Sequence, residues 1–415
     1  MSTGTDWHRT FRLILLLMIV CTTVAFSGSG IKDEDDAAAI VLWMRNNGGR
    51  VDKRFGLGSF SYEGGTYRGA VALENIAAGT EILFCPWKLV FGTEGNTASV
   101  PTDHCAVLRS YAKEVVAGKD SFWYPYLSMD NSLTTRIPLM WHKSALNELQ
   151  GLPPSSFDDA IKQQPNLKDW FCQNCVGGKP FDTLDKPTQQ SLISAITRAA
   201  GMRFMPIFDL LNHHNGLLNT ISSATVDGNS LTTTKDIAAG EEIFNSYRGG
   251  RETSSEIFRR YGFIEHWPQQ WAWVDSVTSK EERFLLLPND SLIIDPPDSM
   301  TSHIGQRALS LHEMQSESNQ HSSMLTLERL TRFSEAGRRL LESLPTTVEE
   351  DLVILVELNH NLLIHDQQDE EKAQLAGDTI LAVSYRMHFK EAIETAIKSV
   401  ENILLSRQNK VRKEL

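Results

Sequence analysis

Several sequence motifs that identify common enzyme classes are missing from this chain of 415 residues. It contains no G-x-x-x-x-G-K-[ST], G-x-G-x-x-G, G-x-S-x-G or H-E-x-x-H motif. Their absence removes the usual sequence support for an ATPase, a Rossmann-type dehydrogenase, an α/β-hydrolase and a zinc protease.

Basic residues are also in short supply. The chain has 40 lysines and arginines against 52 aspartates and glutamates, which gives a net charge of −12. Non-specific binding to DNA or RNA requires a basic surface, because the protein must neutralise phosphates. We therefore expect no nucleic-acid partner.

Cysteine is rare as well. Five cysteines in 415 residues are too few for a disulfide-scaffolded domain. Cys172 and Cys175 form a lone C-x-x-C pair, and the sequence has no second pair to complete a zinc site of four ligands. The pair is open to three interpretations: buried thiols, a local disulfide, and redox or metal chemistry. We expect no metal ion.

Residues 1–30 have the pattern of a targeting segment. Arg9 and Arg12 flank the start of the apolar run Leu13–Val20, and small residues follow at 27–30. This order is typical of a cleaved signal peptide. An uncleaved anchor and a buried helix are alternatives, although a membrane span needs about 20 apolar residues. We expect the secretory pathway, the ER or membrane anchoring, with any membrane contact confined to this segment.

The remaining composition, 41% apolar and 22% charged, is that of an ordinary globular protein. Strand patterns and a hairpin with an Asp-Gly turn are predicted at 67–72, 81–84, 221–226 and 231–234. Helical periodicity is predicted at 37–48, 110–116, 144–149, 191–200, 325–344, 348–364 and 373–405. This order predicts an α+β fold: a β domain at 37–285, split by a helical insert at about 95–195, and a helical domain at 300–415.

One strand–turn–strand sequence occurs twice. Residues 76–82 read I-A-A-G-T-E-I, and residues 237–243 read I-A-A-G-E-E-I. The offset of 161 residues is too long for a solenoid repeat. We interpret the pair as two similar strand–turn–strand units.

The most informative segment is 205–215, M-P-I-F-D-L-L-N-H-H-N, which places Asp209, Asn212 and His213 at the edge of an apolar run. An amide and a neutral imidazole can each donate and accept hydrogen bonds. The pattern therefore suits a ligand site, and a capped turn packed on the core is the alternative. Tyr247 follows in the run F-N-S-Y, where a core aromatic is the alternative.

These residues resemble the motifs of SET-domain methyltransferases, in the split-SET branch of the Rubisco large-subunit lysine and actin-histidine methyltransferases. Residues 209–213 resemble its D-x-x-N-H motif, and Tyr247 resembles its closing tyrosine. Further similar elements follow the family order: R-G-A-V-A at 68–72, P-Y-L at 125–127, L-Q-G at 149–151, R-R-Y-G-F at 259–263 and Y-R at 385–386.

The resemblance implies an enzyme that transfers a methyl group from S-adenosyl-L-methionine to a lysine, or a histidine, of a non-histone protein. It implies that Tyr247 lines the transfer point as the catalytic residue, and we expect a monomer. The cofactor-binding residues that it implies are Arg68, Gly69, Arg198, Asp209, Asn212, His213 and Phe263. Among them, Arg198 is expected to contact the cofactor's carboxylate, because a guanidinium forks onto a carboxylate.

The loop after Tyr247 departs from the family. It reads R-G-G-R-E-T-S-S over 248–255, where the family has a shorter Y-G-x-x-S-N, so Ser255 replaces the asparagine. This difference leaves the substrate open. It also motivates an alternative, in which the chain is a catalytically inactive SET-fold scaffold for protein interactions.

Overall fold

The computed structural model describes most of the chain outside its N-terminal segment. The described ranges are 34–62, 65–93, 99–130, 137–149, 152, 167–215, 217–247, 253–265, 268–287, 292–294, 326–364 and 370–414. The predicted targeting segment lies outside them, as do residues 248–252 of the unusual loop. None of the helices in these ranges has the length and apolar character needed to cross a membrane.

The strands form antiparallel sheets that match the predicted α+β arrangement. Their orders are β1-β4-β6-β5, β2-β3-β7 and β10-β9-β8. The bounds are β1 (Arg50–Val51), β2 (Phe55–Tyr62), β3 (Gly65–Ala72), β4 (Glu81–Pro86), β5 (Thr220–Ala224), β6 (Gly228–Thr233), β7 (Glu242–Ile243), β8 (Gln269–Val274), β9 (Glu281–Leu286) and β10 (Leu292–Ile294). The predicted hairpin is β5–β6, and its turn precedes Gly228.

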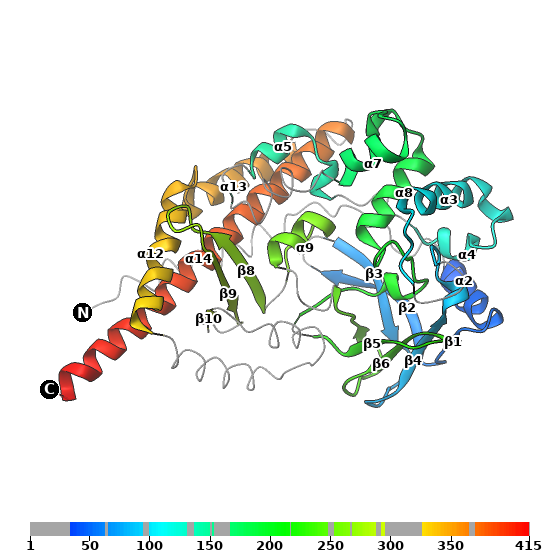
Figure 1. Ribbon diagram of the computed structural model, residues 1–415, viewed down its shortest axis with the longest axis horizontal. Coiled ribbons are helices and arrows are strands. Elements are labelled where there is room, and N and C mark those ends of the chain that lie inside the picture. The colour runs from blue at the N-terminus through cyan, green and yellow to red at the C-terminus, as the bar shows by residue number, and fades with distance from the viewer. Residues whose placement is uncertain are drawn as a thin grey trace.

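The helices before the second β segment lie in two places. The N-terminal helix and those of the insert are α2 (Glu34–Asn46), α3 (His104–Ala117), α4 (Tyr124–Leu127), α5 (Lys143–Asn147), α7 (Leu167–Cys175) and α8 (Lys186–Thr197). In Figure 1, α5 lies beside the C-terminal helix, apart from α2, α3 and α4. After the second β segment come α9 (Ser254–Tyr261), α12 (Leu327–Ser343), α13 (Val348–Ile364) and α14 (Glu370–Glu414). Single 3-10 turns are η1 (Trp87–Leu89), η2 (Gly118–Asp120), η4 (Pro138–Met140), η5 (Phe181–Thr183) and η6 (Phe208–Leu210).

Polar side chains begin several of these helices. The carboxylates of Asp103 and Asp185 accept hydrogen bonds from main-chain N–H groups in the first turns of α3 and α8. Thr253 and Glu256 form a reciprocal capping box at the start of α9. Each such contact satisfies a helix N–H group that would otherwise lack a partner, which typically stabilises the helix by about 1 kcal/mol.

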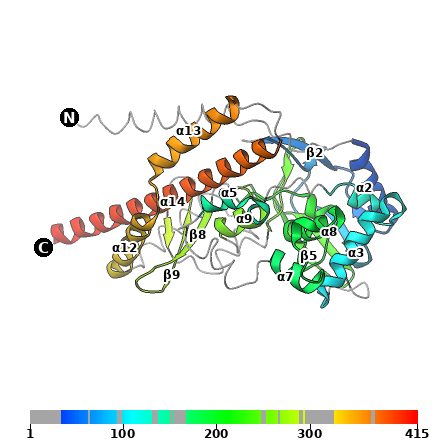
Figure 2. The same ribbon diagram turned by 90° about the horizontal axis from the view of Figure 1, so that it is seen from above.

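Two hydrophobic cores support the molecule. The first joins α2, the strands β1–β4, β6 and β7, and the insert helices α3 and α8. The second packs Trp271 and Trp273 of β8 against Phe333 of α12 and Tyr385 of α14. In both ribbon views α12 and α13 lie along the long helix α14 (Figures 1 and 2). The second core contains residues from both sides of position 285, where the β domain is expected to end. The domain bounds therefore stay a prediction.

The repeated sequence forms two units that lie side by side. The main chains of Ile76 and Ile237 exchange reciprocal hydrogen bonds, both 2.9 Å long. Each unit turns at a glycine with positive φ, 78° at Gly79 and 84° at Gly240, a conformation that glycine adopts without steric strain. The interpretation as two similar units is confirmed, and the structure shows that they pair with each other.

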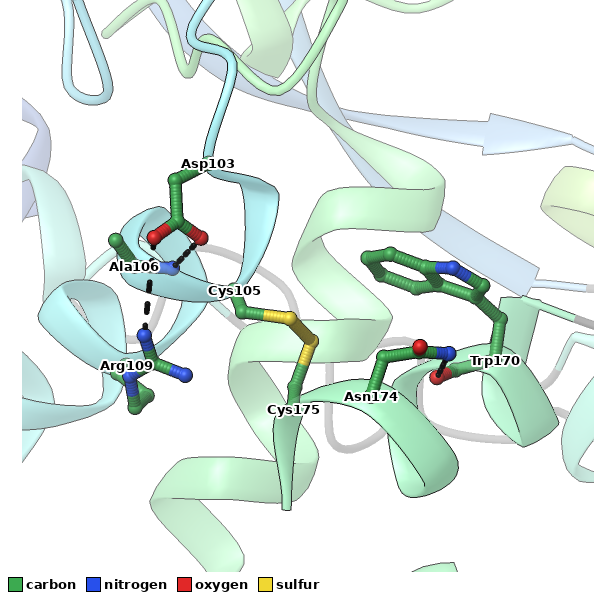
Figure 3. The surroundings of a disulfide bond; sticks show 7 residues. All are labelled: Asp103, Cys105, Ala106, Arg109, Trp170, Asn174 and Cys175. Atoms are coloured by element: carbon green, nitrogen blue, oxygen red, sulfur yellow. Dashed lines mark hydrogen bonds and ion pairs between the residues drawn. A yellow bond between two sulfur atoms is a disulfide. The ribbon is translucent and has the colours of Figure 1, made fainter. Parts of the chain in front are cut away.

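The interpretation of Cys172 and Cys175 as a local disulfide is wrong. Cys175, at the end of α7, is bonded to Cys105 in the first turn of α3, with the two Cα atoms 5.1 Å apart (Figure 3). Cys172 is a buried free thiol. The two cysteines pair because α3 and α7 lie next to each other in the fold, although Cys105 and Cys175 are 70 positions apart in the sequence. The ranges that the structure describes hold no group of three or more His, Cys, Asp and Glu side chains arranged for a metal ion.

Candidate functional site

The predicted site residues come from separate parts of the chain, and the fold brings them into contact. Arg68 and Gly69 lie in β3, next to β7 in the same sheet. Asp209 lies in η6, and Asn212 and His213 follow it directly. The remaining residues follow α8 (Arg198), β7 (Tyr247) and α9 (Phe263).

The turn that carries the D-x-x-N-H motif contains an unusual backbone conformation. Ile207, just before η6, is fully buried and has a φ of 72°. Residues with a branched side chain rarely adopt this left-handed conformation, which is strained by roughly 1–3 kcal/mol. The surrounding core therefore holds the turn in place, and it sets where Asp209 and Asn212 lie.

Asn212 is fixed by both hydrogens of its amide. Its Nδ2 donates to the main-chain oxygen of Arg68 at 2.8 Å and to Oε1 of Glu242 at 2.7 Å. Gly69 makes this arrangement feasible, because a Cβ at this position would lie 2.2 Å from Glu242 Oε1 and 2.9 Å from Asn212 Nδ2. The close approach of β3, Asn212 and Glu242 therefore requires glycine at position 69.

Glu242 was not predicted as a site residue. It lies in β7 with 7% of its surface exposed, and its Oε2 atom is buried without a hydrogen-bond partner. Burial raises the pKa of its carboxyl from 4.5 to about 8. A buried acid without a partner for one oxygen is unusual in a native structure. It marks a position where a ligand can complete the hydrogen bonding.

His213 is held from both ring nitrogens. Its Nε2 lies 2.8 Å from Oε1 of Glu265, and its Nδ1 accepts a hydrogen bond from the main-chain N–H of Tyr247 at 3.1 Å. The Nδ1 atom must therefore be unprotonated, and Nε2 carries the proton that it donates to the carboxylate. Oε1 of Glu265 also accepts from Asn215, and its Oε2 accepts from Ser254.

Tyr247 lies among aromatic rings. It stacks on His213 with ring centroids 5.1 Å apart, and the rings of Tyr261 and Phe263 lie 4.6 and 6.5 Å away. Its hydroxyl donates to the main-chain oxygen of Leu211 at 3.1 Å. Burial raises its pKa to about 12, so the phenol is neutral at physiological pH. The aromatic rings thus surround Tyr247, and its hydroxyl is held at a fixed position by Leu211.

Arg198 is engaged inside the protein. Its Nε lies 3.2 Å from Oδ1 of Asp130, and both side chains are buried. Asp130 Oδ2 also accepts hydrogen bonds from Tyr111, Gln190 and Ser194. The Arg198 charge and these hydrogen bonds hold the pKa of Asp130 below its ordinary value, against the effect of burial. The guanidinium predicted to meet the cofactor's carboxylate is thus already paired with an internal carboxylate.

Asp209 and Arg68 lie next to this pair. Asp209 accepts a short hydrogen bond from the hydroxyl of Tyr126, and its Oδ1 is buried without a partner. Burial raises the pKa of Asp209 to about 6. Arg68 donates to the main-chain oxygen of Met129 at 2.6 Å, and burial together with the nearby Arg198 lowers its pKa to about 10. Two arginines and two aspartates therefore share one buried polar cluster.

The structure thus brings Asn212, His213 and Tyr247 together, and it places Phe263 against the same rings. The functional roles assigned to them stay predictions. Sequence reasoning missed the partners that hold them in place, namely Glu242, Glu265, Asp130 and Tyr126. Glu242 could have been noticed because it lies in the repeated I-A-A-G segment, whereas nothing in the sequence around Glu265 pointed to His213.

A shallow hollow of about 280 Å³ lies elsewhere, beside the disulfide. It is lined by Thr102, Asp103, His104, Cys105 and Trp170. Figure 3 shows Trp170 and Asp103 on either side of the disulfide, and none of the predicted site residues lines this hollow. It offers one carboxylate, which is already bonded to the N–H of Ala106. The converging polar groups around Asn212 favour that region as the functional site.

Comparisons with known proteins agree with this location. Residues 67–248 match the family described as the SET domain, and the matched range contains β3, Asn212, His213 and Tyr247. The actin-histidine N-methyltransferase of Xenopus tropicalis is 24% identical over 92% of this chain and 72% of its own length. The N-lysine methyltransferase setd6 of the same species is 36% identical over 19% of this chain and 18% of its own length.

Solved structures have the same fold. A structure of Rubisco LSMT bound to AdoMet covers 89% of this chain and 92% of its own, with a TM-score of 0.52 and 19% identity. The SET domain of LSMT bound to lysine and AdoHcy covers 91% of this chain with a TM-score of 0.51 and 17% identity. Residues 67–248 therefore match the SET domain, and the sheets and C-terminal helices of the chain follow the fold of Rubisco LSMT.

Proposed function

We propose that this protein is an S-adenosyl-L-methionine-dependent protein methyltransferase of the SET type. The observation that carries the proposal is the convergence of Asn212, His213 and Tyr247 beside Gly69, within the range that matches the SET domain. Relatives with whole-chain similarity are named actin-histidine N-methyltransferases, and a structural neighbour was solved bound to AdoMet.

The residues present fit such a cofactor. Asn212 uses both amide hydrogens on the protein, so its Oδ1 is left to accept from a ligand ammonium. Glu242 behind it has a buried carboxyl oxygen without a partner. Gly69 keeps the strand edge open, and the rings of His213 and Phe263 offer an apolar surface for a nucleobase. When bound, the cofactor supplies a methyl group on a positively charged sulfur.

Tyr247 is proposed to line the point of transfer. Its hydroxyl is neutral and is held by Leu211, so it presents an oxygen dipole at a fixed place without a charge. The surrounding rings place apolar surface next to the point of transfer, which favours the neutral form of an entering amine or imidazole. Aligning a nucleophilic nitrogen with the methyl group can lower a barrier by about 7–11 kcal/mol.

The side chain that accepts the methyl group is proposed to be a histidine or a lysine of a non-histone protein. The relatives with whole-chain similarity carry the name of a histidine methyltransferase, and the setd6 match, which supports lysine, covers a smaller part of the chain. A lysine has an ordinary pKa of about 10.4 and must lose a proton before it reacts, whereas most histidines are already neutral at pH 7.

A transfer assay tests this function. The purified protein is incubated with cell lysate and methyl-labelled S-adenosyl-L-methionine, and the labelled protein is hydrolysed to separate methylhistidine from methyllysine. We expect one labelled product, and we expect Tyr247→Phe to lose transfer while calorimetry shows that cofactor binding is retained. Absence of cofactor binding by a well-folded wild type would instead favour the inactive scaffold, which no contact described above supports.

We also propose that the protein is made in the secretory pathway or held at its membranes through the N-terminal segment. The disulfide between Cys105 and Cys175 supports this, because disulfides persist mainly in oxidising compartments. Mass spectrometry of protein from its native cells, with thiols blocked before lysis, is expected to find the Cys105–Cys175 peptide pair. Recovery of both cysteines as thiols in a cytosolic fraction would exclude this location.

The finer assignment of partners is also a proposal. We propose that the protein acts as a monomer on a protein substrate and has no nucleic-acid partner, which its net charge of −12 supports. Light scattering after gel filtration is expected to give the mass of one chain. A mass of two chains at micromolar concentration would contradict the monomer.

A further inference from the structure

Glu242 is a buried acid whose function the SET-domain match does not explain. Its Oε1 accepts from Asn212, its Oε2 has no partner, and its side chain lies beneath Gly69. The main chain on either side is firmly held, because Asn219 Nδ2 donates to the Glu242 main-chain oxygen at 2.8 Å and its Oδ1 accepts from Phe244 N–H at 2.8 Å. The carboxyl is therefore kept in this position by the fold.

The repeated sequence provides an internal comparison. Glu81 is the counterpart of Glu242, since both precede the last isoleucine of their I-A-A-G unit. Glu81 is exposed, forms an ion pair with Arg50 at 2.8 Å and accepts from Ser230. Two residues in equivalent positions thus have opposite surroundings: one acid is satisfied at the surface, and the other is buried with an open acceptor.

The contacts of Asn212 define what the buried acid can do. An amide has two N–H donors and one oxygen, and both donors are used by Arg68 and Glu242. If Glu242 did not accept, the amide could turn and present a donor to the ligand. Glu242 therefore fixes the orientation of the Asn212 amide, so that its oxygen faces a ligand and the Glu242 carboxyl lies behind it. Such a pair selects a cation that carries N–H groups.

We propose that Glu242 is a positioning residue that makes Asn212 recognise the α-ammonium of the methyl donor. This inference rests on the proposed function, in which Glu242 would contribute to binding of the methyl donor. The chemical class selected is a nucleoside that carries a cationic amino-acid chain. A nucleoside without that chain gains nothing from Glu242.

Calorimetry with two nucleosides tests this inference on the full-length protein. S-adenosylhomocysteine carries the amino-acid chain, and 5′-methylthioadenosine lacks it. Glu242→Gln keeps the size of the side chain and one oxygen for Asn212, but it cannot ionise, whereas a bound ammonium favours the ionised form of the Glu242 carboxyl. We expect this variant to bind S-adenosylhomocysteine about tenfold more weakly, the effect typical of losing one charge-assisted hydrogen bond, and to bind 5′-methylthioadenosine as the wild type does. Glu81→Gln, the matched control, is expected to bind both like the wild type.

The kinetic counterpart is a rise in KM for S-adenosyl-L-methionine with an unchanged kcat, because the positioned group acts on binding. Equal weakening of both nucleosides in Glu242→Gln would show a merely structural role and overturn the inference while leaving the proposed function intact. Unchanged affinity for both would also overturn it. A wild type that binds neither nucleoside would overturn the proposed function, and this inference with it.

Discussion

The main-chain N–H of Tyr247 donates a hydrogen bond to Nδ1 of His213, and this contact selects the tautomer of the histidine. A hydrogen on Nδ1 would lie against that N–H group, so the ring N–H is on Nε2, facing Glu265. The tyrosine at the proposed transfer point and the histidine of the motif are therefore oriented by one another, and Glu265 holds the histidine.

We expect Glu265→Gln to lower the free energy of unfolding by roughly 1–3 kcal/mol, because one of its buried partners loses an acceptor. Affinity for the cofactor should fall as well, since His213 is no longer held. Denaturant unfolding and calorimetry measure the two effects. Glu281→Gln, at an exposed position of β9, is the control. Wild-type stability in Glu265→Gln would show that the carboxylate does not hold His213.

Gly69→Ala is expected to disrupt the site directly. The added Cβ would lie 2.2 Å from Glu242 Oε1, so the carboxyl or the strand must move, at roughly 1–3 kcal/mol. We expect the variant to lose most of its affinity for S-adenosylhomocysteine. Gly58→Ala changes the cross-strand partner of Gly69, and its Cβ would meet Val71 at a milder 3.3 Å. Equal binding by the two variants would contradict the close approach at Gly69.

Tyr385 of α14 connects the C-terminal helices to α9. Its hydroxyl donates to Ser255 Oγ at 2.6 Å, and its ring stacks on Phe258 with centroids 3.9 Å apart. We expect Tyr385→Phe to lower the free energy of unfolding by about 1 kcal/mol, because the ring stays packed and one hydrogen bond is lost. A double-mutant cycle with Ser255→Ala checks the contact, and strictly additive effects would show that the two residues do not interact.

Glu242 also predicts how stability depends on pH. Burial raises the pKa of its carboxyl in the folded protein to about 8, from 4.5 when exposed, so the folded state binds the proton more tightly than the unfolded state. Its contribution to stability is full below pH 4.5 and is lost as the pH rises to about 8. Unfolding free energies measured across this range should fall less steeply in Glu242→Gln. Parallel curves for the two proteins would contradict the raised pKa.

Much of the fold could be predicted from local patterns. The periodic segments at 325–344 and 348–364 became α12 and α13, and the Asp-Gly signal marked the β5–β6 hairpin. The motif residues Asn212, His213 and Tyr247 were found because the family resemblance fixes their order along the chain. Each of these features is encoded in a short stretch of sequence, by helical periodicity, by a turn dipeptide or by a motif.

The partners of those residues could not be predicted in the same way. Glu265 lies 52 positions from His213, Asp130 lies 68 positions before Arg198, and Cys105 lies 70 positions from Cys175. Such pairs depend on which elements pack together, and a single sequence does not record that. Arg198 illustrates the limit: its chemistry suits a cofactor carboxylate, but the fold also places Asp130 beside it.

The excursion of the chain between Phe91 and Phe204 leaves and returns at neighbouring points, because these two main chains exchange hydrogen bonds of 3.0 and 2.9 Å. Residues of this excursion hold two buried charged groups that lie outside it: Tyr126 donates to Asp209, and the main-chain oxygen of Met129 accepts from Arg68. Replacing the excursion by a short linker would therefore bridge the gap easily, yet it would leave Asp209 and Arg68 in the interior without these partners. The helices of this region are thus indispensable to the polar centre that they cover.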